Sequence, residues 1–291
     1  MHVIAHGGAG QAPDDPDARQ TALAEAVSAG MSAQTPERSV VEVVRTLESD
    51  PRFNAGVGGA VQSDGTIRTD AGLMTSDGET GAACAMRGVE HAVDVARVVK
   101  RETPHVLLAG ERAVGLGEAF GVATGCDLWT PETRERWEGA DPPDSDGVYD
   151  RLSWLRGRFG ADDGDRDHDT VGAVATDGDR LAAATSTGGR WFALSGRVGD
   201  VPQVGAGFYA TGTAAASATG EGEAIARFGL ARRAVGAVAD GASPGAAAQQ
   251  AIERFGAETG ASAGVIVLDR AGEAGRAHNA EAMGTAWSGE R

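Results

Sequence analysis

Lysine is almost absent from this chain of 291 residues, in which Lys100 is the only one. The other bases are arginines, and 42 acidic residues against 26 basic ones give a formal net charge of -16. Nucleic acids and anionic membranes are bound through basic patches, so this charge balance argues against both as partners. Because salt screens the self-repulsion of such an acidic surface, we expect a halophilic source.

Cysteine is scarce as well, since Cys84 and Cys126 are the only two. Their spacing fits neither a disulfide framework nor a redox motif, and the six histidines lack metal-ligand spacing. No apolar run approaches the roughly 18 residues that span a membrane, and the first residues do not form a signal peptide. We therefore expect a cytoplasmic protein without an organic cofactor or a catalytic metal.

Glycine, in contrast, is abundant, with 44 residues and no repeat. A hydrophobic content of 41% is enough for one large core or two modest ones. Periodicity in the first half predicts helices over residues 16–32, 35–47, 94–100 and 105–119. Between them, short β runs are predicted at residues 60–62, 66–68, 71–74 and 81–86. These patterns indicate a mixed α and β fold with antiparallel strands.

The best-patterned stretch of the chain covers residues 168–189. Two runs of small and apolar residues flank an Asp-Gly turn, which predicts a β-hairpin. Further along, helices are predicted over residues 223–238 and from Ser243 onward. A last hairpin is predicted to pair residues 263–268 with residues 274–278.

The segment over residues 125–167 differs from its surroundings, because it is rich in proline and acidic clusters. Such a segment buries too little apolar surface to order itself fully. Its large apolar side chains are expected to anchor it locally, and they are Trp129, Trp137, Tyr149, Trp154 and Leu155.

Thr170 occupies the first position of the predicted hairpin, directly after Asp169. A threonine at this place is commonly a β-branched strand residue. It becomes a nucleophile when it is the first residue of a chain, because its own α-amine then serves as the base. The pKa of that amine is about 7.7–8, so a useful fraction is neutral at neutral pH. This chemistry requires that the bond between Asp169 and Thr170 be cut in a precursor.

Several motifs accompany this threonine in a fixed order. They are HGGAG near the start, then HDTVGAVATDG, LAAATSTGG, GRVGDVPQVGAGFYA and ATGEGE. Together they resemble the threonine-type N-terminal nucleophile hydrolases, and within these the plant-type L-asparaginases, also called isoaspartyl peptidases. The resemblance runs from His6 to about Trp287 and lapses between about Gly125 and Asp167.

The resemblance implies an α+β fold, a four-layer αββα sandwich that two subunits form together. Self-cleavage would give an α-subunit of residues 1–169, with an acidic flexible tail over about 125–168, and a β-subunit of residues 170–291. The two subunits are expected to form an (αβ)2 heterotetramer. The partner in catalysis would be a small-molecule or dipeptide substrate.

The resemblance also assigns the residues around the nucleophile. The Thr187 hydroxyl is expected to face Thr170. A guanidinium suits a carboxylate, and a carboxylate suits an ammonium, so Arg197 and Asp200 would hold the two charged groups of an aspartyl unit. On many protein surfaces such an Arg and Asp simply form an exposed pair. The binding loop comprises Arg197, Val198, Gly199 and Asp200.

The motif ATGEGE supplies a second part of the site. Thr219 and Gly220 are expected to stabilise the oxyanion of a tetrahedral intermediate. Gly222 would help to seat the α-amine of the substrate, and Glu221 would influence selectivity for the leaving group. Without the resemblance, Thr219 would be interpreted as a helix N-cap.

Two glycine-rich loops are expected to support the site. Gly8 and Gly10 belong to the HGGAG loop, which the resemblance places near the scissile bond. Asn54 belongs to the second loop and would lie near the nucleophile. The resemblance also implies a structural sodium ion near residues 47–53, whose carbonyl oxygens are suitable ligands for a hard cation.

The sequence does not distinguish among three substrates, which are the β-amide of L-asparagine, β-aspartyl peptides and glycosylated asparagine. Most plant-type asparaginases have glycine before the nucleophile. Here His168 and Asp169 precede Thr170, a pattern closer to the related glycosylasparaginases. This departure makes a glycosylasparaginase the main alternative.

Two further alternatives belong to other classes. Residues 260–264 match the G-x-S-x-G motif of serine esterases, and Asp269 and His278 follow it in the order of a triad. That motif needs a strand before the serine and a helix after it, whereas here a helix is predicted before and a strand after. The other alternative is a binding protein that is never cleaved.

Overall fold

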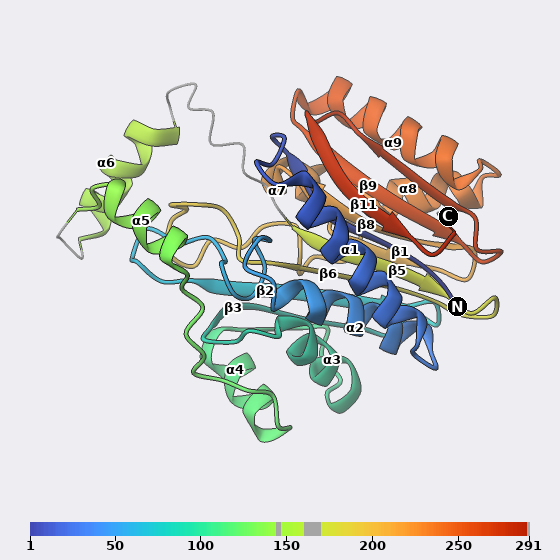
Figure 1. Ribbon diagram of the computed structural model, residues 1–291, viewed down its shortest axis with the longest axis horizontal. Coiled ribbons are helices and arrows are strands. Elements are labelled where there is room, and N and C mark those ends of the chain that lie inside the picture. The colour runs from blue at the N-terminus through green and yellow to red at the C-terminus, as the bar shows by residue number, and fades with distance from the viewer. Residues whose placement is uncertain (144–146, 160–169, 290–291) are drawn as a thin grey trace.

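Two β-sheets, stacked face to face, occupy the centre of the molecule (Figure 1). The computed structural model describes residues 1–143, 147–159 and 170–289. The strands of the larger sheet are β1 (His2–Gly10), β2 (Arg68–Thr75), β3 (Thr80–Arg87), β4 (Leu107–Ala109), β5 (Val171–Thr176), β6 (Leu181–Thr187) and β11 (Ala282–Trp287). Those of the smaller sheet are β7 (Phe208–Ala210), β8 (Ala214–Gly220), β9 (Ala263–Asp269) and β10 (Ala274–His278).

The larger sheet has the strand order β11-β1-β5-β6-β2-β3-β4, and the smaller one has the order β10-β9-β8-β7. Neighbouring strands pair antiparallel, except that β4 runs parallel to β3. The pair β5–β6, which contains the hairpin after Thr170, therefore lies in the middle of the larger sheet.

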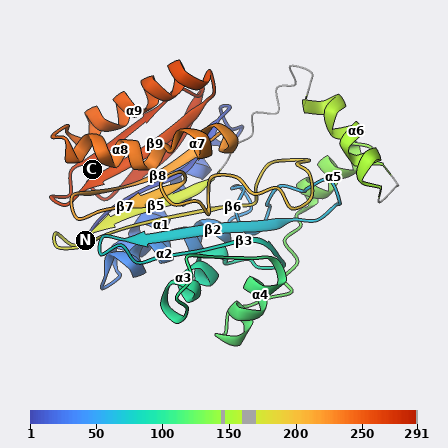
Figure 2. The same cartoon turned by 180° about the vertical axis from the view of Figure 1, so that it is seen from behind.

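Helices cover the outer faces of both sheets (Figures 1 and 2). The larger sheet is covered by α1 (Pro16–Met31), α2 (Pro36–Glu48), α3 (Ala92–Glu102) and α4 (Gly110–Ala119). The smaller sheet is covered by α8 (Leu230–Ala239) and α9 (Pro244–Thr259), with the short α7 (Gly222–Phe228) in front of them. To one side of the sandwich lie α5 (Pro131–Gly139) and α6 (Val148–Phe159).

A layer of apolar side chains joins the two sheets, and it includes Val174, Phe208 and Ile266. On the opposite face of β5, Val171 and Ala173 pack under the helices of the larger sheet. Because side chains alternate across a strand, a strand buried on both sides is apolar on both faces. The order helix, sheet, sheet, helix confirms the predicted four-layer αββα sandwich.

Local signals in the sequence place several elements correctly. The Thr35 hydroxyl accepts a hydrogen bond from the Arg38 amide at the start of α2, and Ser243 caps α9 in the same way. In the β5–β6 turn, Asp177 accepts hydrogen bonds from two following amides, and Gly178 has φ 94°. The predicted starts of these two helices and the predicted hairpin are therefore confirmed.

Two predicted helices differ from the structure. The helix predicted over residues 105–119 begins as the edge strand β4 and becomes helical only at Gly110. The helix predicted over residues 223–238 is divided in two at Gly229, whose φ of 72° ends α7 before α8 begins. Periodicity alone did not reveal this break, because the apolar spacing continues across the glycine.

The strand predictions were also incomplete. The predicted runs at residues 60–62 and 66–68 form only an isolated bridge between Val61 and Ile67, followed by β2. The strands β7, β8 and β11 were not predicted. β8 and β11 consist largely of alanine, glycine, serine and threonine, which carry little alternation of polar and apolar residues, and β7 has only three residues.

The acidic segment contains more regular structure than its composition predicts, namely α5 and α6. Trp137 and Trp154 pack edge to face with ring centroids 6.3 Å apart, which supplies the apolar contact that the two helices need. Leu155 is buried, whereas Tyr149 is 88% exposed and anchors nothing. The predicted cleavage site after Asp169 lies outside the described residues.

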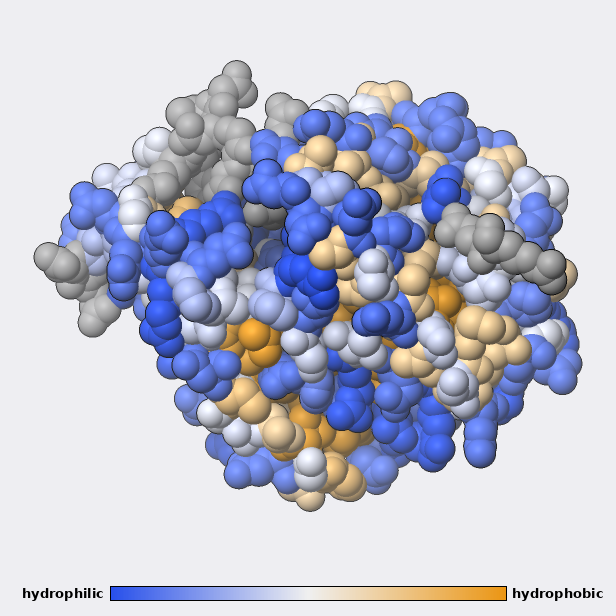
Figure 3. Space-filling view, in the orientation of Figure 1, coloured by the Kyte–Doolittle hydropathy of each residue, from blue (hydrophilic) through white to orange (hydrophobic). Residues whose placement is uncertain are grey.

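The single lysine is an interior residue. Its side chain is 4% exposed, and its amine lies 3.3 Å from a carboxylate oxygen of Glu37 and 2.9 Å from one of Glu79. The surface is mostly hydrophilic on the face shown in Figure 3. None of the helices in the described ranges is long and apolar enough to cross a membrane.

Candidate active site

Thr170 lies immediately before β5 and is 6% exposed. The strands β5 and β6 pair with Val171 opposite Ser186, so the next residue of β6, Thr187, comes to lie beside Thr170. The hydroxyl oxygens of the two threonines are 3.4 Å apart. The structure thus brings together the predicted nucleophile and the hydroxyl predicted to face it.

Asn54 fixes the loop that surrounds this pair. Its side chain donates to the Gly189 carbonyl at 2.7 Å and accepts from the Ala60 amide at 2.8 Å. Its backbone carbonyl accepts from the Gly188 amide at 2.8 Å and lies 3.4 Å from the Thr187 hydroxyl. Asn54 therefore lies near the nucleophile, as predicted, and acts there by holding the end of β6.

His6, at the start of the HGGAG motif, lies against the backbone of Thr170. Burial lowers the pKa of its imidazole to about 3, and the ring adjoins the Thr170 backbone. Its Nε2 is 2.8 Å from the Ser217 hydroxyl, which is 2.8 Å from the Thr185 hydroxyl. Because Thr185 donates its proton to the Gly207 carbonyl at 3.0 Å, Ser217 donates to Thr185 and His6 donates from Nε2. The lowered pKa means that the imidazole is neutral near pH 7.

The glycines of the same motif shape the strand around His6. The register of β1 against β11 shifts between His6 and Ala9, and Gly8 has φ 110°, a conformation that a side chain rarely adopts. Gly10 ends β1 at the rim of a small cavity. The strand β1 thus continues through the motif instead of ending before it.

Thr219 reaches the same region from the smaller sheet. A Cβ on Gly172 would lie 2.0 Å from the Ser217 oxygen, so β5 and β8 touch at this point. Thr170 is two residues before Gly172, Thr219 is two residues after Ser217, and side chains two apart share a face. Farther from Thr170 and Thr219, β5 and β8 both contribute side chains to the apolar layer between the sheets. Thr170 and Thr219 therefore lie at the same end of the sandwich.

The turn after Thr219 is tightly constrained. Gly220 has φ 133°, and a Cβ on it would lie 2.5 Å from the Ser262 carbonyl oxygen, so only glycine fits. Glu221 occupies the N-cap position of α7, which excludes that role for Thr219. The Glu221 carboxylate accepts from the Ser262 amide at 2.9 Å, so this side chain is held toward β9.

Arg197, Asp200 and Gly222 converge at one point. A Cβ on Gly222 would lie 2.8 Å from Arg197 Nη2 and equally 2.8 Å from Asp200 Oδ1. A Cβ on Gly199 would likewise meet the Arg197 guanidinium, and the neighbouring Val198 is half-buried. Arg197 forms its salt bridge with Glu223 through two hydrogen bonds of 2.8 and 2.7 Å. The alternative of an exposed pair between Arg197 and Asp200 is therefore excluded, since Asp200 is buried and Arg197 is paired with Glu223.

The two carboxyl groups beside Arg197, those of Asp200 and Glu223, have pKa values shifted in opposite directions. Burial raises the pKa of the Asp200 carboxyl to about 7, against the attraction of Arg197. The hydrogen bond from Arg197 lowers the pKa of Glu223 to about 2. Asp200 Oδ2 is buried and has no hydrogen-bond partner among the described residues. An unpaired buried carboxylate beside an arginine is suited to bind the ammonium of a zwitterionic ligand.

Asp70 is a site residue that sequence reasoning missed. It lies on β2 opposite Thr187, its carboxylate accepts from the Ala85 amide at 2.7 Å, and Ala85 adopts φ 54° at this irregular point of the β2–β3 pair. Burial raises the pKa of Asp70 to about 7, and its charge interacts with Arg197 and Asp200. An aspartate inside an apolar strand run, TDAGLM, was the available signal.

The esterase alternative does not fit the structure. Ser262 follows helix α9 and precedes strand β9, which is the reverse of a nucleophile elbow. His278 is an exposed residue of β10, and its Nδ1 is 3.0 Å from the Ala280 carbonyl oxygen.

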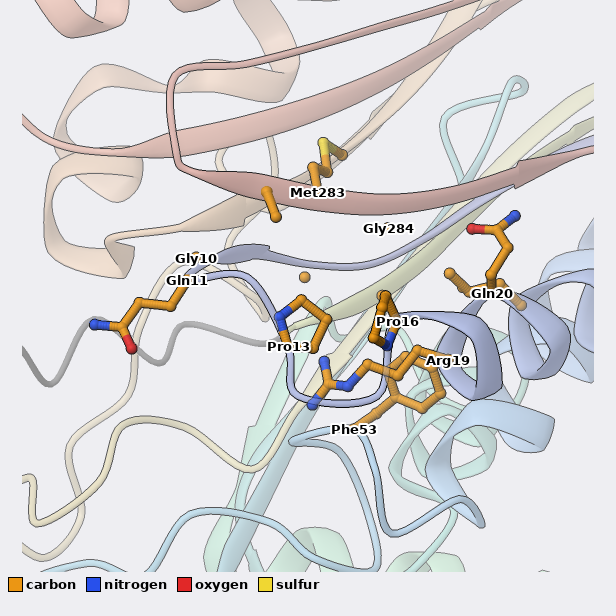
Figure 4. A pocket seen from close by; sticks show the side chains of 13 residues that line it. Gly10, Gln11, Pro13, Pro16, Arg19, Gln20, Phe53, Met283 and Gly284 are labelled. Atoms are coloured by element: carbon orange, nitrogen blue, oxygen red, sulfur yellow. The ribbon is translucent and has the colours of Figure 1, made fainter.

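A cavity of about 200 Å³ lies behind the glycine motif of β1 (Figure 4). Its walls come from β1, α1, the loop at Phe53 and β11, and its lining includes Gly8, Arg19 and Met283. It contains none of the predicted catalytic or binding side chains.

Comparison with known proteins agrees with this geometry. The sequence model of a family described as asparaginase matches residues 1–291. The chain belongs to the asparaginase family. Members of the asparaginase family hydrolyse C–N bonds, and so the chain is a hydrolase of this class.

Three relatives from the asparaginase family show how similar this chain is to known proteins. A plant-type L-asparaginase of Pyrococcus abyssi is 36% identical, with 99% of this chain and 96% of that protein covered. An isoaspartyl peptidase/L-asparaginase of Danio rerio is 35% identical over 93% of this chain and 86% of its own length. An isoaspartyl peptidase of Escherichia coli is 40% identical over 85% of this chain and 77% of its own length.

Proposed function

We propose that this protein is a self-processing amidohydrolase that cleaves the β-amide of L-asparagine, β-aspartyl peptides, or both, with Thr170 as nucleophile. The observation that carries the proposal is the pair of buried threonine hydroxyls, 3.4 Å apart, at the start of the central strand. The relatives, named L-asparaginase and isoaspartyl peptidase, support this choice of substrates.

The proposed reaction begins with release of the Thr170 amine. In the precursor, the Thr170 hydroxyl attacks the Asp169 carbonyl carbon and expels the amide nitrogen, which forms an ester. Water hydrolyses that ester and leaves a carboxylate on Asp169 and a free amine on Thr170. The amine, with a pKa near about 8 in solution, then takes the hydroxyl proton during attack on substrate.

Turnover follows the same pattern. The Thr170 oxygen attacks the β-carbonyl carbon of the substrate, and the Thr219 hydroxyl and Gly220 amide stabilise the resulting oxyanion. The amine gives its proton to the leaving nitrogen, and water then releases aspartate from the acyl-enzyme. The Thr187 hydroxyl, which donates to the Asn54 carbonyl, accepts from the Thr170 hydroxyl and so orients it for attack.

The charged groups near Gly222 are proposed to hold the aspartyl part of the substrate. Arg197 binds the α-carboxylate, and Asp200, which has an unpaired buried oxygen, binds the α-ammonium. Glu223 occupies two donors of the same guanidinium. The substrate carboxylate therefore uses the remaining Nη1 or displaces the partly exposed Glu223.

Thr170→Ala tests the nucleophile. We expect it to abolish processing and turnover together, because it removes the only group that attacks in both steps. Denaturing electrophoresis would show one band near the 29.5 kDa of the full chain instead of two fragments. N-terminal sequencing of the wild type should start the second fragment at Thr170.

Thr170→Ser is the matched control, because it keeps the hydroxyl. It should still be cleaved and active. A Thr170→Ala protein that is cleaved and hydrolyses asparagine would refute the assignment.

Glycosylasparaginase remains the alternative, because His168 and Asp169 precede the nucleophile. Comparing ammonia release from L-asparagine with aspartate release from β-aspartyl dipeptides and glycosylated asparagine separates the substrates.

Three further features remain predictions: the (αβ)2 assembly, a cytoplasmic location and a structural sodium ion. The ion would be held by carbonyl oxygens of residues 47–53. Glu48, Asp50 and Phe53 each accept one backbone hydrogen bond, which leaves a second lone pair on each oxygen for a hard cation.

A further inference from the structure

The two helices beside the sandwich hold an aromatic side chain of the substrate loop. Trp137 of α5 and Trp154 of α6 both pack on the ring of Phe192, with centroid distances of 6.2 and 5.4 Å. Phe192 lies five residues before Arg197 in the loop that follows β6. The rings of Trp154 and Phe192 meet edge to face at 83°, a favourable aromatic geometry.

Phe192 itself is held in an unusual conformation. Its φ of 58° lies in the left-handed region, which is costly for a residue with a side chain. It is 5% exposed, and its amide donates to the Val61 carbonyl at 2.7 Å. Such a conformation persists only where surrounding contacts enforce it, and the two tryptophans supply those contacts.

A series of hydrogen bonds continues from Phe192 toward Arg197. The Ser63 amide donates to the Ala193 carbonyl at 2.8 Å, and the Ser195 amide donates to the Ser63 hydroxyl at 3.1 Å. The loop over residues 192–197 is thereby attached along the short segment over residues 61–63.

Gln62 makes the last connection. Its Oε1 accepts from the Gly196 amide and from Arg68 Nη1, each at 2.8 Å. Since both partners are donors, the orientation of the amide is fixed and Nε2 is left to donate to the Arg197 carbonyl at 3.2 Å. Arg68 is in turn held by a two-point salt bridge to Asp64. The Gln62 side chain thus holds the backbone of both Gly196 and Arg197.

We propose that α5 and α6 form a clamp, defined by Trp137, Trp154 and Phe192, that positions Arg197 for the substrate through Gln62. The tryptophans precede the predicted cleavage site and Phe192 follows it, so the clamp joins the two subunits without needing the bond between them. This inference rests on the role proposed above for Arg197.

The test measures KM and kcat separately in mature enzyme, with L-asparagine and a β-aspartyl dipeptide as substrates. We expect Trp154→Ala and Gln62→Met each to raise KM about tenfold and to change kcat less than about twofold, because they displace a group that binds the substrate equally in ground and transition states. A purely structural role would lower the thermal midpoint and the active fraction without changing KM.

Tyr149→Ala is the matched control on the same helix, because Tyr149 is 88% exposed, and its KM should equal that of the wild type. Arg197→Lys serves as the reference for a lost carboxylate contact. A normal KM in a folded Trp154→Ala or Gln62→Met protein, beside a raised KM in Arg197→Lys, would overturn the clamp alone. A normal KM in Arg197→Lys would overturn the site assignment and the clamp together. Should Trp154→Ala fail to fold, Gln62→Met decides the question.

Discussion

Two buried carboxyls, Asp70 and Asp200, dominate the electrostatics of the site. Burial raises the pKa of each to about 7. The charge of Asp70 also raises the pKa of Asp200, whereas the charge of Arg197 lowers the pKa of both carboxyls. Near neutral pH, the empty site therefore has a variable charge, which makes substrate binding sensitive to pH.

Activity should fall on the acid side of about pH 7. Asp200 binds an ammonium only as a carboxylate, so protonation below its pKa of about 7 raises KM. The Thr170 amine must also be deprotonated, and its unperturbed pKa is about 7.7–8. Because both groups must lose a proton, the slope of log(kcat/KM) against pH should exceed one and approach two below about pH 7. Steady-state kinetics between about pH 5 and pH 9 measures this slope.

Asp70→Asn provides the check on this reasoning. It keeps an oxygen that accepts from the Ala85 amide but removes the negative charge that raises the pKa of Asp200. The acid limb should therefore move to lower pH. An unchanged limb would show that Asp70 does not influence the substrate-binding carboxylate.

Sequence reasoning predicted part of this residue set. Thr170, Thr187 and Arg197 belong to motifs that resemble those of the plant-type asparaginases, and the resemblance implied their roles. Asp70 and Glu223 were not predicted as site residues, because each pairs with a residue that is distant in the sequence. A carboxylate reveals its function only when its burial and its partners are known.

At the scale of elements, the short helix α7 is decisive, because it carries Gly222 and Glu223 into the site. Gly229 ends it with φ 72° and directly starts α8. The helical register therefore changes at this residue, and the orientation of α7 is independent of that of α8.

Gly229→Ala should destabilise the protein by about 1–2 kcal/mol, because an L-side chain is disfavoured at this positive φ. Chemical denaturation, followed by circular dichroism, measures the change. KM should also rise, since α7 carries Glu223 next to Arg197.

Gly236→Ala is the matched control within α8. A Cβ there meets nothing within 4 Å, and its backbone is helical, so it should be neutral or stabilise by up to about 1 kcal/mol. Equal effects of the two substitutions would contradict the conformational argument.

Elements with strong local signals could be predicted, and those without them could not. Thr35 and Ser243 cap their helices, and the Asp-Gly turn sets the hairpin after Thr170. The strands β8 and β11 have no such signal, since both consist largely of small residues and β8 is buried along its whole length. Their place in the sheets depends on partners far away in the chain.

At the scale of the whole molecule, the formal charge of -16 opposes compactness. Salt at molar concentration screens this repulsion, because the Debye length falls to about 3 Å at 1 M. We therefore expect the thermal midpoint to rise between about 0.05 and 2 M salt, measured by differential scanning fluorimetry.

Comparing NaCl with KCl separates screening from a specific ion. Screening acts equally in both salts. A sodium ion in the loop over residues 47–53 would raise the midpoint in NaCl at concentrations of a few millimolar, on the order of its Kd, while KCl would not. A midpoint that falls with salt would refute the expected halophilic adaptation.

The enclosure of Lys100 between Glu37 and Glu79 affects how this enzyme can be chemically modified. No other side chain of the protein carries a primary amine. Acylating dyes would therefore react only with the ends of polypeptides, and the proposed self-scission would create a new end at Thr170. The number of dye molecules attached per chain would then count maturation events directly, and occupation of the site by a ligand would slow the reaction of that one new end.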